Sequence, residues 1–171
     1  MIPAIHTLEV VGIGISLLLG GRVWQNRSKP GAVPLVVITI GVTVWLVGKV
    51  GSSLIDTTGV LHLREGVSVF TVLLFCGVSV TTAGWGAFTL DFSGYVNHLT
   101  WRLTAFLAIE PIVVVVAVLT NPLHNTWYYP KPGVILGTTY WAHTAYSYVV
   151  TLGGIGLLLW MLRKKQTLYS R

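Results

Sequence analysis

Five apolar segments, each long enough to cross a lipid bilayer, constrain the fold of this chain more than any other feature. They lie at roughly 3–22, 33–55, 67–90, 99–120 and 141–162. A helix needs about 20 mostly apolar residues to cross ~30 Å of hydrocarbon. Lipid leaves unpaired backbone groups without a partner, and a helix satisfies these groups within itself. The sequence therefore predicts one integral-membrane domain over residues 1–171, an all-α polytopic bundle of five transmembrane helices without a sheet.

The placement of charge predicts how this bundle is oriented. Only 9% of the 171 residues are charged, against roughly 25% in soluble domains. The bases gather in the connection after the first segment, at Arg102 and at the C-terminal cluster 163–171, whereas the opposite side holds only Arg64 and Lys131, plus Lys49 inside a segment. Because Lys and Arg are retained on the cytoplasmic side, this asymmetry places the N-terminus outside and the C-terminus in the cytoplasm. We expect a multi-pass protein of the cell membrane whose partner is the lipid bilayer, not nucleic acid.

Three charged residues fall inside the apolar segments: Glu9, Lys49 and Glu110. Each costs on the order of 3 kcal/mol or more in lipid, so each needs a partner or a purpose. Glu9 and Lys49 lie at a similar depth, ~9 Å from the outer helix ends, where the two side chains can pair. One interpretation is a ligand-binding polar pocket that also includes Glu110, Tyr146 and Tyr148. The alternative is a structural ion pair, or a Lys49 side chain that extends to the membrane surface.

The histidines and glycines are the residues that could form a haem, metal or phosphate site. His6 and His143 both fall near outer helix ends, where they could face one another as axial haem ligands, but they lie closer to the membrane edge than haem ligands in helical bundles. The other histidines lack the spacing of metal ligands, so we expect no cofactor and no metal. Gly153, Gly154 and Gly156 lie mid-helix and are interpreted as a surface for close helix packing.

Catalytic motifs are missing from the sequence. It has no Gly-x-Ser-x-Gly, no paired Asp motif and no phosphate-binding loop. The predicted cytoplasmic loops are too short to form a domain. We therefore expect no enzymatic activity from this chain alone.

Several short motifs recur in one order along the chain. Pro30-Gly31-Ala32 leads into a helix with Trp45, and the third segment ends in Phe88-Thr89-Leu90-Asp91-Phe92-Ser93-Gly94. The motif of Thr120, Asn121 and His124 follows the helix that contains Pro111, and Tyr146-Ser147-Tyr148 comes later. In this order the motifs resemble the N-terminal seven-helix membrane region of sensor histidine kinases, many of them archaeal.

The resemblance implies a membrane sensor of a two-component system. In that family two more helices and a kinase module normally follow, so a kinase core would have to lie downstream, and the chain is either a fragment or a stand-alone relative. The first function considered is a sensory and signal-transduction module. A second is a structural or accessory subunit of a membrane complex, with a homodimer or other membrane subunits as partners. A third is a small electron or solute carrier.

Overall fold

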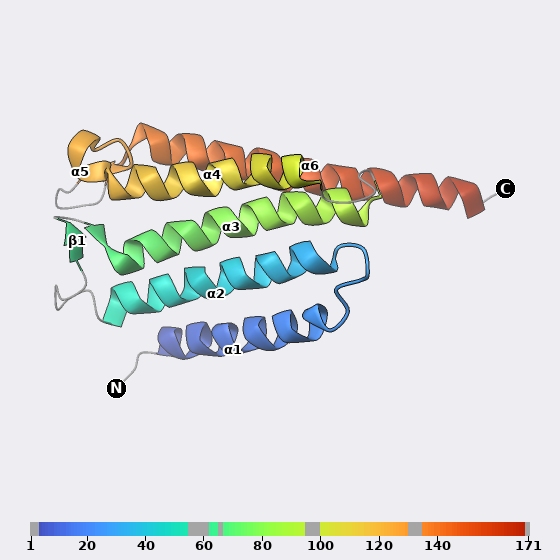
Figure 1. Ribbon diagram of the computed structural model, residues 1–171, viewed down its shortest axis with the longest axis horizontal. Helices are drawn as coiled ribbons and strands as arrows, with labels where there is room; N and C mark the ends of the chain where they lie inside the picture. Colours follow the sequence, from blue (N-terminus) through green and yellow to red (C-terminus); the bar gives the residue numbers. More distant parts are fainter. Residues whose placement is uncertain (1–3, 55–61, 65–66, 95–99, 130–134, 170–171) are drawn as a thin grey trace.

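The chain folds into a bundle of long helices that run side by side (Figure 1). The computed structural model describes residues 4–54, 62–64, 67–94, 100–129 and 135–169. Its helices are α1 (Ala4–Trp24), α2 (Ala32–Leu54), α3 (Val69–Phe92), α4 (Trp101–Leu119), α5 (Asn121–His124) and α6 (Thr138–Tyr169). All except the short α5 are long and apolar enough to span a membrane, which gives five candidate spans. The predicted all-α polytopic bundle is confirmed.

Two short antiparallel ribbons supplement the helices. They pair β1 (His62–Arg64) with β2 (Val67–Ser68), and β3 (Tyr128–Tyr129) with β4 (Ile135–Leu136). The sequence does not predict these ribbons, because strands of two or three residues are too short to show a period-2 pattern. Within the described residues they belong to the connections between spanning helices, so the spanning part is entirely helical.

The helix ends differ from the predicted ranges, most clearly in α6. This helix runs from Thr138 to Tyr169, beyond both ends of the predicted range 141–162. Apolarity marks the part of a helix that lipid can cover, whereas Arg, Lys and Gln are good helix formers and continue α6 past that part. The predicted boundaries at residues 3, 55 and 99, and Lys131, lie outside the described residues.

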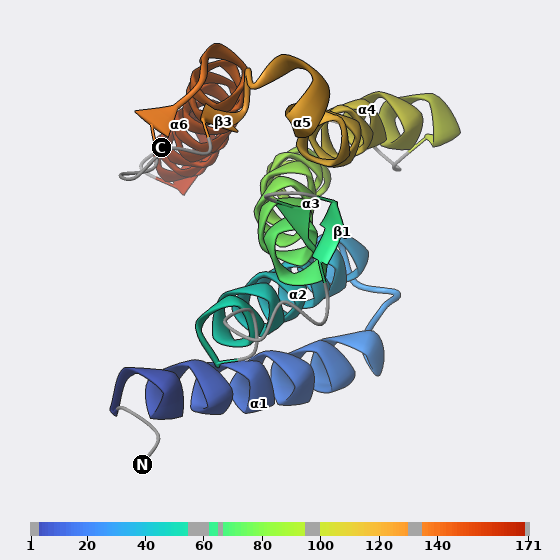
Figure 2. The ribbon, with the colours of Figure 1, turned by 90° about the vertical axis from the view of Figure 1, so that its left-hand side faces the viewer.

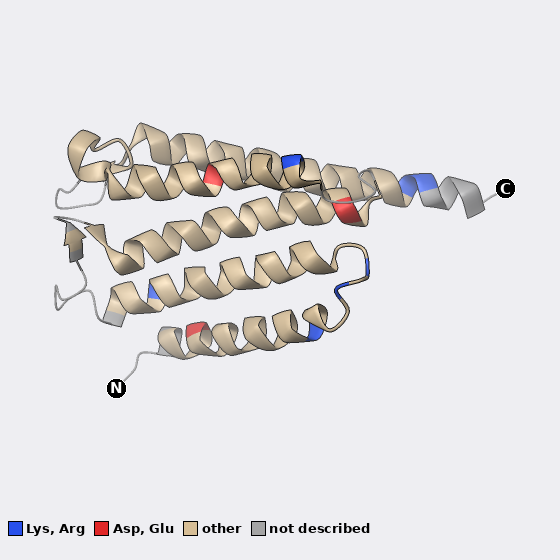
Figure 3. Cartoon of the chain, in the orientation of Figure 1, with Lys and Arg blue, Asp and Glu red and all other residues tan. Residues whose placement is uncertain are grey.

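Helix α3 is the central element of the bundle. Seen from one end, α2 and then α1 lie on one side of it, and α4 and α6 lie on the other (Figure 2). The basic residues Arg22, Arg27, Lys29, Arg163 and Lys164 belong to the last turn of α1, to the connection between α1 and α2, and to the distal part of α6. These two regions lie at the same end of the bundle (Figure 3), which we call the basic end. The connections that carry β1 and α5 lie at the other end.

Glycines allow α2 and α3 to approach backbone to backbone. A Cβ atom added to Gly41 would lie 2.7 Å from the backbone nitrogen of Thr81, and one added to Gly77 would overlap the backbone of Trp45. Gly48 is in a similar position against the backbone of α3. Small residues at such positions are the usual means of close helix packing in membranes.

The glycine run in α6 packs at one position only. A Cβ atom on Gly154 would lie 2.6 Å from Nε1 of Trp85, whereas Gly153 and Gly156 have open space around the place of a Cβ. The interpretation of this run as a packing surface is therefore confirmed for Gly154, whereas Gly153 and Gly156 meet no neighbouring helix among the described residues. Neighbouring positions on a helix point about 100° apart, so consecutive glycines cannot all face one partner helix.

Candidate functional site

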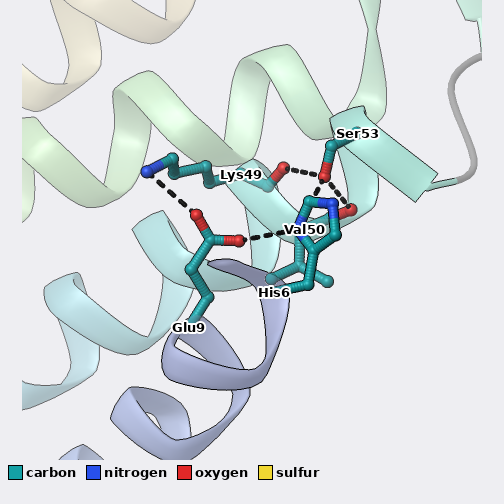
Figure 4. A network of polar contacts seen from close by, with 5 residues as sticks. All are labelled: His6, Glu9, Lys49, Val50 and Ser53. Atoms are coloured by element: carbon teal, nitrogen blue, oxygen red, sulfur yellow. Dashed lines mark hydrogen bonds and ion pairs between the residues drawn. The ribbon is translucent and has the colours of Figure 1, made fainter. Parts of the chain in front are cut away.

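Glu9 lies at the centre of a polar cluster between α1 and α2 (Figure 4). Its Oε1 atom is 2.9 Å from Nζ of Lys49, and its Oε2 atom is 3.1 Å from Nδ1 of His6. The Ser53 hydroxyl lies 3.4 Å from the same Nδ1 atom. We call His6, Glu9, Lys49 and Ser53 the α1–α2 cluster. The ion pair expected from the matched depths of Glu9 and Lys49 is present, and both carboxylate oxygens have a partner.

The local structure explains why this cluster forms. His6 and Glu9 are three residues apart, so they share one face of α1. Lys49 and Ser53 are four residues apart on α2, and the Ser53 hydroxyl donates to the carbonyl oxygen of Lys49 at 3.1 Å or to that of Val50 at 3.0 Å. The Glu9 side chain is only 8% exposed, whereas that of Lys49 is 47% exposed. The carboxylate of Glu9 is therefore held in place, and the side chain of Lys49 extends to it from the neighbouring helix.

A second carboxylate–imidazole pair lies on the other side of α3. Oε1 of Glu110, on α4, is 2.5 Å from Nδ1 of His143, on α6, and the two side chains are 14% and 6% exposed. We call these two residues the α4–α6 pair. Oε2 of Glu110 is buried without a hydrogen-bond partner among the described residues, and so is Oγ of Ser147, one turn after His143. A buried carboxylate with one unused acceptor is unusual, since buried polar atoms are normally satisfied.

An aromatic core covers the α4–α6 pair. Trp127 is fully buried, and its ring centroid lies 5.5 Å from that of His143 and 5.0 Å from that of Phe75. Its Nε1 atom also lacks a partner among the described residues. The core around it consists of Val67, Val114 and Val118, with Tyr140 packed against it. The pair is therefore screened from water on this side by apolar groups.

Asn121 positions Trp127. Its Oδ1 atom accepts the backbone N–H groups of Trp127 at 2.9 Å and Tyr128 at 3.3 Å, and its Nδ2 group donates to the carbonyl oxygen of Tyr128 at 2.9 Å. The Asn121 residue is itself only 2% exposed. One buried amide thus closes the turn that returns Trp127 to the bundle.

His124 ties the end of α4 to the same turn. Its Nδ1 atom accepts the backbone N–H of Thr126 at 3.1 Å, so the ring hydrogen is on Nε2, which lies 3.0 Å from Oγ1 of Thr120. The Thr120 hydroxyl in turn donates to the carbonyl oxygen of Val116 at 2.7 Å. Thr120, Asn121 and His124 therefore stabilise the turn that follows α4. In this way the motif positions Trp127.

The remaining residues singled out in the sequence are dispersed. Tyr146 is half-buried on α6 and lies within electrostatic range of Glu110. Tyr148 is 65% exposed, so the structure does not bring it to the α4–α6 pair. Trp45 has an exposed side chain, and its backbone is the part that meets Gly77.

The two histidines considered as haem ligands are not brought together. His6 lies on α1 and His143 on α6, on opposite sides of the bundle (Figure 2), and each contacts its own glutamate. Within the described ranges, no three His, Cys, Asp or Glu side chains are grouped so that they could hold a metal ion. The pairing of His143 with Glu110 is not predicted by the sequence analysis.

These features define a class: a polytopic membrane helix bundle whose intramembrane charges are paired with one another. Residues 8–171 match the family model described as the N-terminal 7TM region of histidine kinase, and the chain belongs to this family. The family description names seven transmembrane helices, of which the described residues contain five candidates. No curated protein and no solved structure shows detectable similarity to the chain.

Proposed function

We propose that this region is the input module of a histidine-kinase signalling system and that the α4–α6 pair responds to the stimulus. The observation that carries this proposal is the buried Oε2 atom of Glu110, which has no partner among the described residues although Oε1 is bonded to His143. Family membership supports the sensory role. The chain itself would contribute no catalytic group, and a kinase core would supply the phosphoryl chemistry.

The chemistry of the pair suits a switch. A histidine is the side chain whose ordinary pKa lies closest to physiological pH, and its proton can move to a bonded carboxylate or be lost. In surroundings of low polarity, a change of one charge or one hydrogen bond is energetically large. A proton, or a polar ligand that donates to Oε2 of Glu110, would therefore change the attraction between α4 and α6, and α6 is the helix that continues to the basic end.

We also propose that the N-terminus lies outside and the C-terminus lies in the cytoplasm of a multi-pass cell-membrane protein. The bases at the α1–α2 connection and at the distal part of α6 support this orientation, because they share one end of the bundle (Figure 3). Reporter enzymes fused after residue 171 and inserted in the α1–α2 connection should be active only in the cytoplasm. Activity of either fusion on the outer side would contradict the orientation.

The signalling role is tested by joining residues 1–171 to a histidine-kinase core and measuring its phosphorylation from labelled ATP in inverted membrane vesicles. E110Q should change basal output at least fivefold, because it replaces the carboxylate that contacts His143 and whose Oε2 atom has no partner among the described residues. E9Q is the matched control, since it removes the carboxylate of the α1–α2 cluster, and it should change basal output far less. Equal responses of both variants and the unaltered chain would show that the α4–α6 pair is not the input.

An accessory role in a membrane complex is supported by the wide exposed apolar surface of α1 and α6, for example at Leu8, Leu18 and Val149, each at least 70% exposed. Lipid covers such a surface equally well, and so would a second copy of the chain. Purification in mild detergent tests the accessory role. A second subunit that copurifies in stoichiometric amount would favour the accessory role over the sensory one.

A further inference from the structure

A groove opens at the basic end of the bundle, away from both polar clusters. Its volume is about 1070 Å³, and its walls come from α2, α3 and α4 with Met161 of α6. We call it the basic-end groove. Apolar side chains such as Val37, Ala87 and Ala108 line its length, and Arg27 and Lys29 stand at its rim. This volume is slightly above the range of about 300–1,000 Å³ that is typical of small-molecule sites.

The length of the groove matches one leaflet of a bilayer. Along α3 the lining runs from Val80 to Asp91, a rise of ~17 Å at 1.5 Å per residue. Half of the ~30 Å hydrocarbon thickness is about the same length. An acyl chain that enters at the rim would therefore reach the bilayer midplane where the groove ends.

The charge at the rim determines which head group fits. Asp91 also lies there, but its Oδ2 atom accepts the backbone N–H of Gly31 at 2.6 Å, a bond that fixes the carboxylate on the α1–α2 connection. Gly31 has φ of +78°, a conformation that L side chains rarely adopt, so this turn needs glycine. Arg27 and Lys29 leave the rim with a net positive charge. Basic residues in a pocket between transmembrane helices on the cytoplasmic side are suited to anionic head groups.

We propose that the basic-end groove binds an anionic phospholipid, with one acyl chain along α3 and the phosphate at Arg27 and Lys29. An acyl chain satisfies the apolar walls, and the phosphate complements the two bases. The site is separate from the α4–α6 pair and does not depend on its role.

The test measures lipid binding by the purified chain in mild detergent, by native mass spectrometry and by thermal melting. The chain is titrated with phosphatidylglycerol, with phosphatidylcholine of the same acyl chains, and with glycerol phosphate alone. Phosphatidylglycerol should bind and raise the melting temperature, phosphatidylcholine should bind at least fivefold more weakly, and glycerol phosphate should not bind detectably. Equal binding of the two lipids, or binding of glycerol phosphate alone, would overturn the proposal.

Matched variants locate the site. K29Q should weaken phosphatidylglycerol binding about fivefold, whereas R102Q removes one base from α4 that does not line the groove and should leave binding unchanged. A108F fills the groove and should abolish binding, whereas A105F places the same ring at an exposed position of α4 outside the lining. If A108F binds the lipid as the unaltered chain does, or changes the oligomeric state instead, the groove does not hold the lipid.

Discussion

Glu9 and Glu110 lie on opposite sides of α3, and each contacts a histidine, yet their surroundings differ. Both oxygens of Glu9 have partners, and one of these partners is the ammonium group of Lys49. Glu110 has a partner for Oε1 only, no described cation contacts it, and an apolar core adjoins its histidine. A satisfied buried polar group rigidifies a structure, whereas an unsatisfied one stores free energy that a proton or ligand can release. The same residue types therefore suit a structural clamp on one side and a responsive site on the other.

If this comparison is right, Trp127 contributes more to the stability of the α4–α6 side than its polar pair does. W127A should lower the free energy of unfolding by about 3–5 kcal/mol, because it removes a large, fully buried ring from the core. The measurement is unfolding in mild detergent, with W101A as control, since Trp101 is 75% exposed. A comparable loss in W101A, or little loss in W127A, would mean that the aromatic core does not hold this side.

The next largest loss of stability is expected on the side of α3 that carries α2 and Glu9, from a change in the spacing between α2 and α3. G77A should lower the free energy of unfolding by about 1–3 kcal/mol, because the added Cβ overlaps the backbone of Trp45. G153A is the control, since its Cβ meets open space and alanine is the better helix former. An unchanged G77A variant would show that the close approach is not required.

The Glu9–Lys49 pair should show coupling in a double-mutant cycle. E9Q and K49M should each lower the melting temperature, and the double variant should be more stable than the sum of the two losses, because neither charge is then left without its partner. Additive losses in the melting temperature would mean that the 2.9 Å contact contributes nothing to stability.

The sequence predicts one of these two sites better than the other for a geometric reason. Glu9 and Lys49 lie near the ends of adjacent antiparallel helices, so counting residues from those ends gives the same depth for both. The same count places His143 two residues into the predicted segment 141–162 and Glu110 about ten residues from the end of 99–120. The predicted depths of the two residues therefore differ, and the count does not predict their contact. In the structure, α6 begins earlier, at Thr138, and the turn closed by Asn121 brings Trp127 against His143. Neither feature has a periodic signal, so hydropathy indicates the spans but not this contact.

The smallest effect on stability is expected from E110Q. The glutamine amide oxygen can still bond to His143 in place of Oε1, and the amide keeps the size of the carboxylate that it replaces. The free energy of unfolding of E110Q should therefore change by less than about 1 kcal/mol. E110A removes the partner of His143 and creates a cavity, so it should lower the free energy of unfolding by about 3 kcal/mol. Detergent unfolding of the two variants, beside the kinase output of E110Q, separates stability from response. A large loss of stability in E110Q would place Glu110 with Glu9 as a structural anchor, and the distinction between the two sides of α3 would then be wrong.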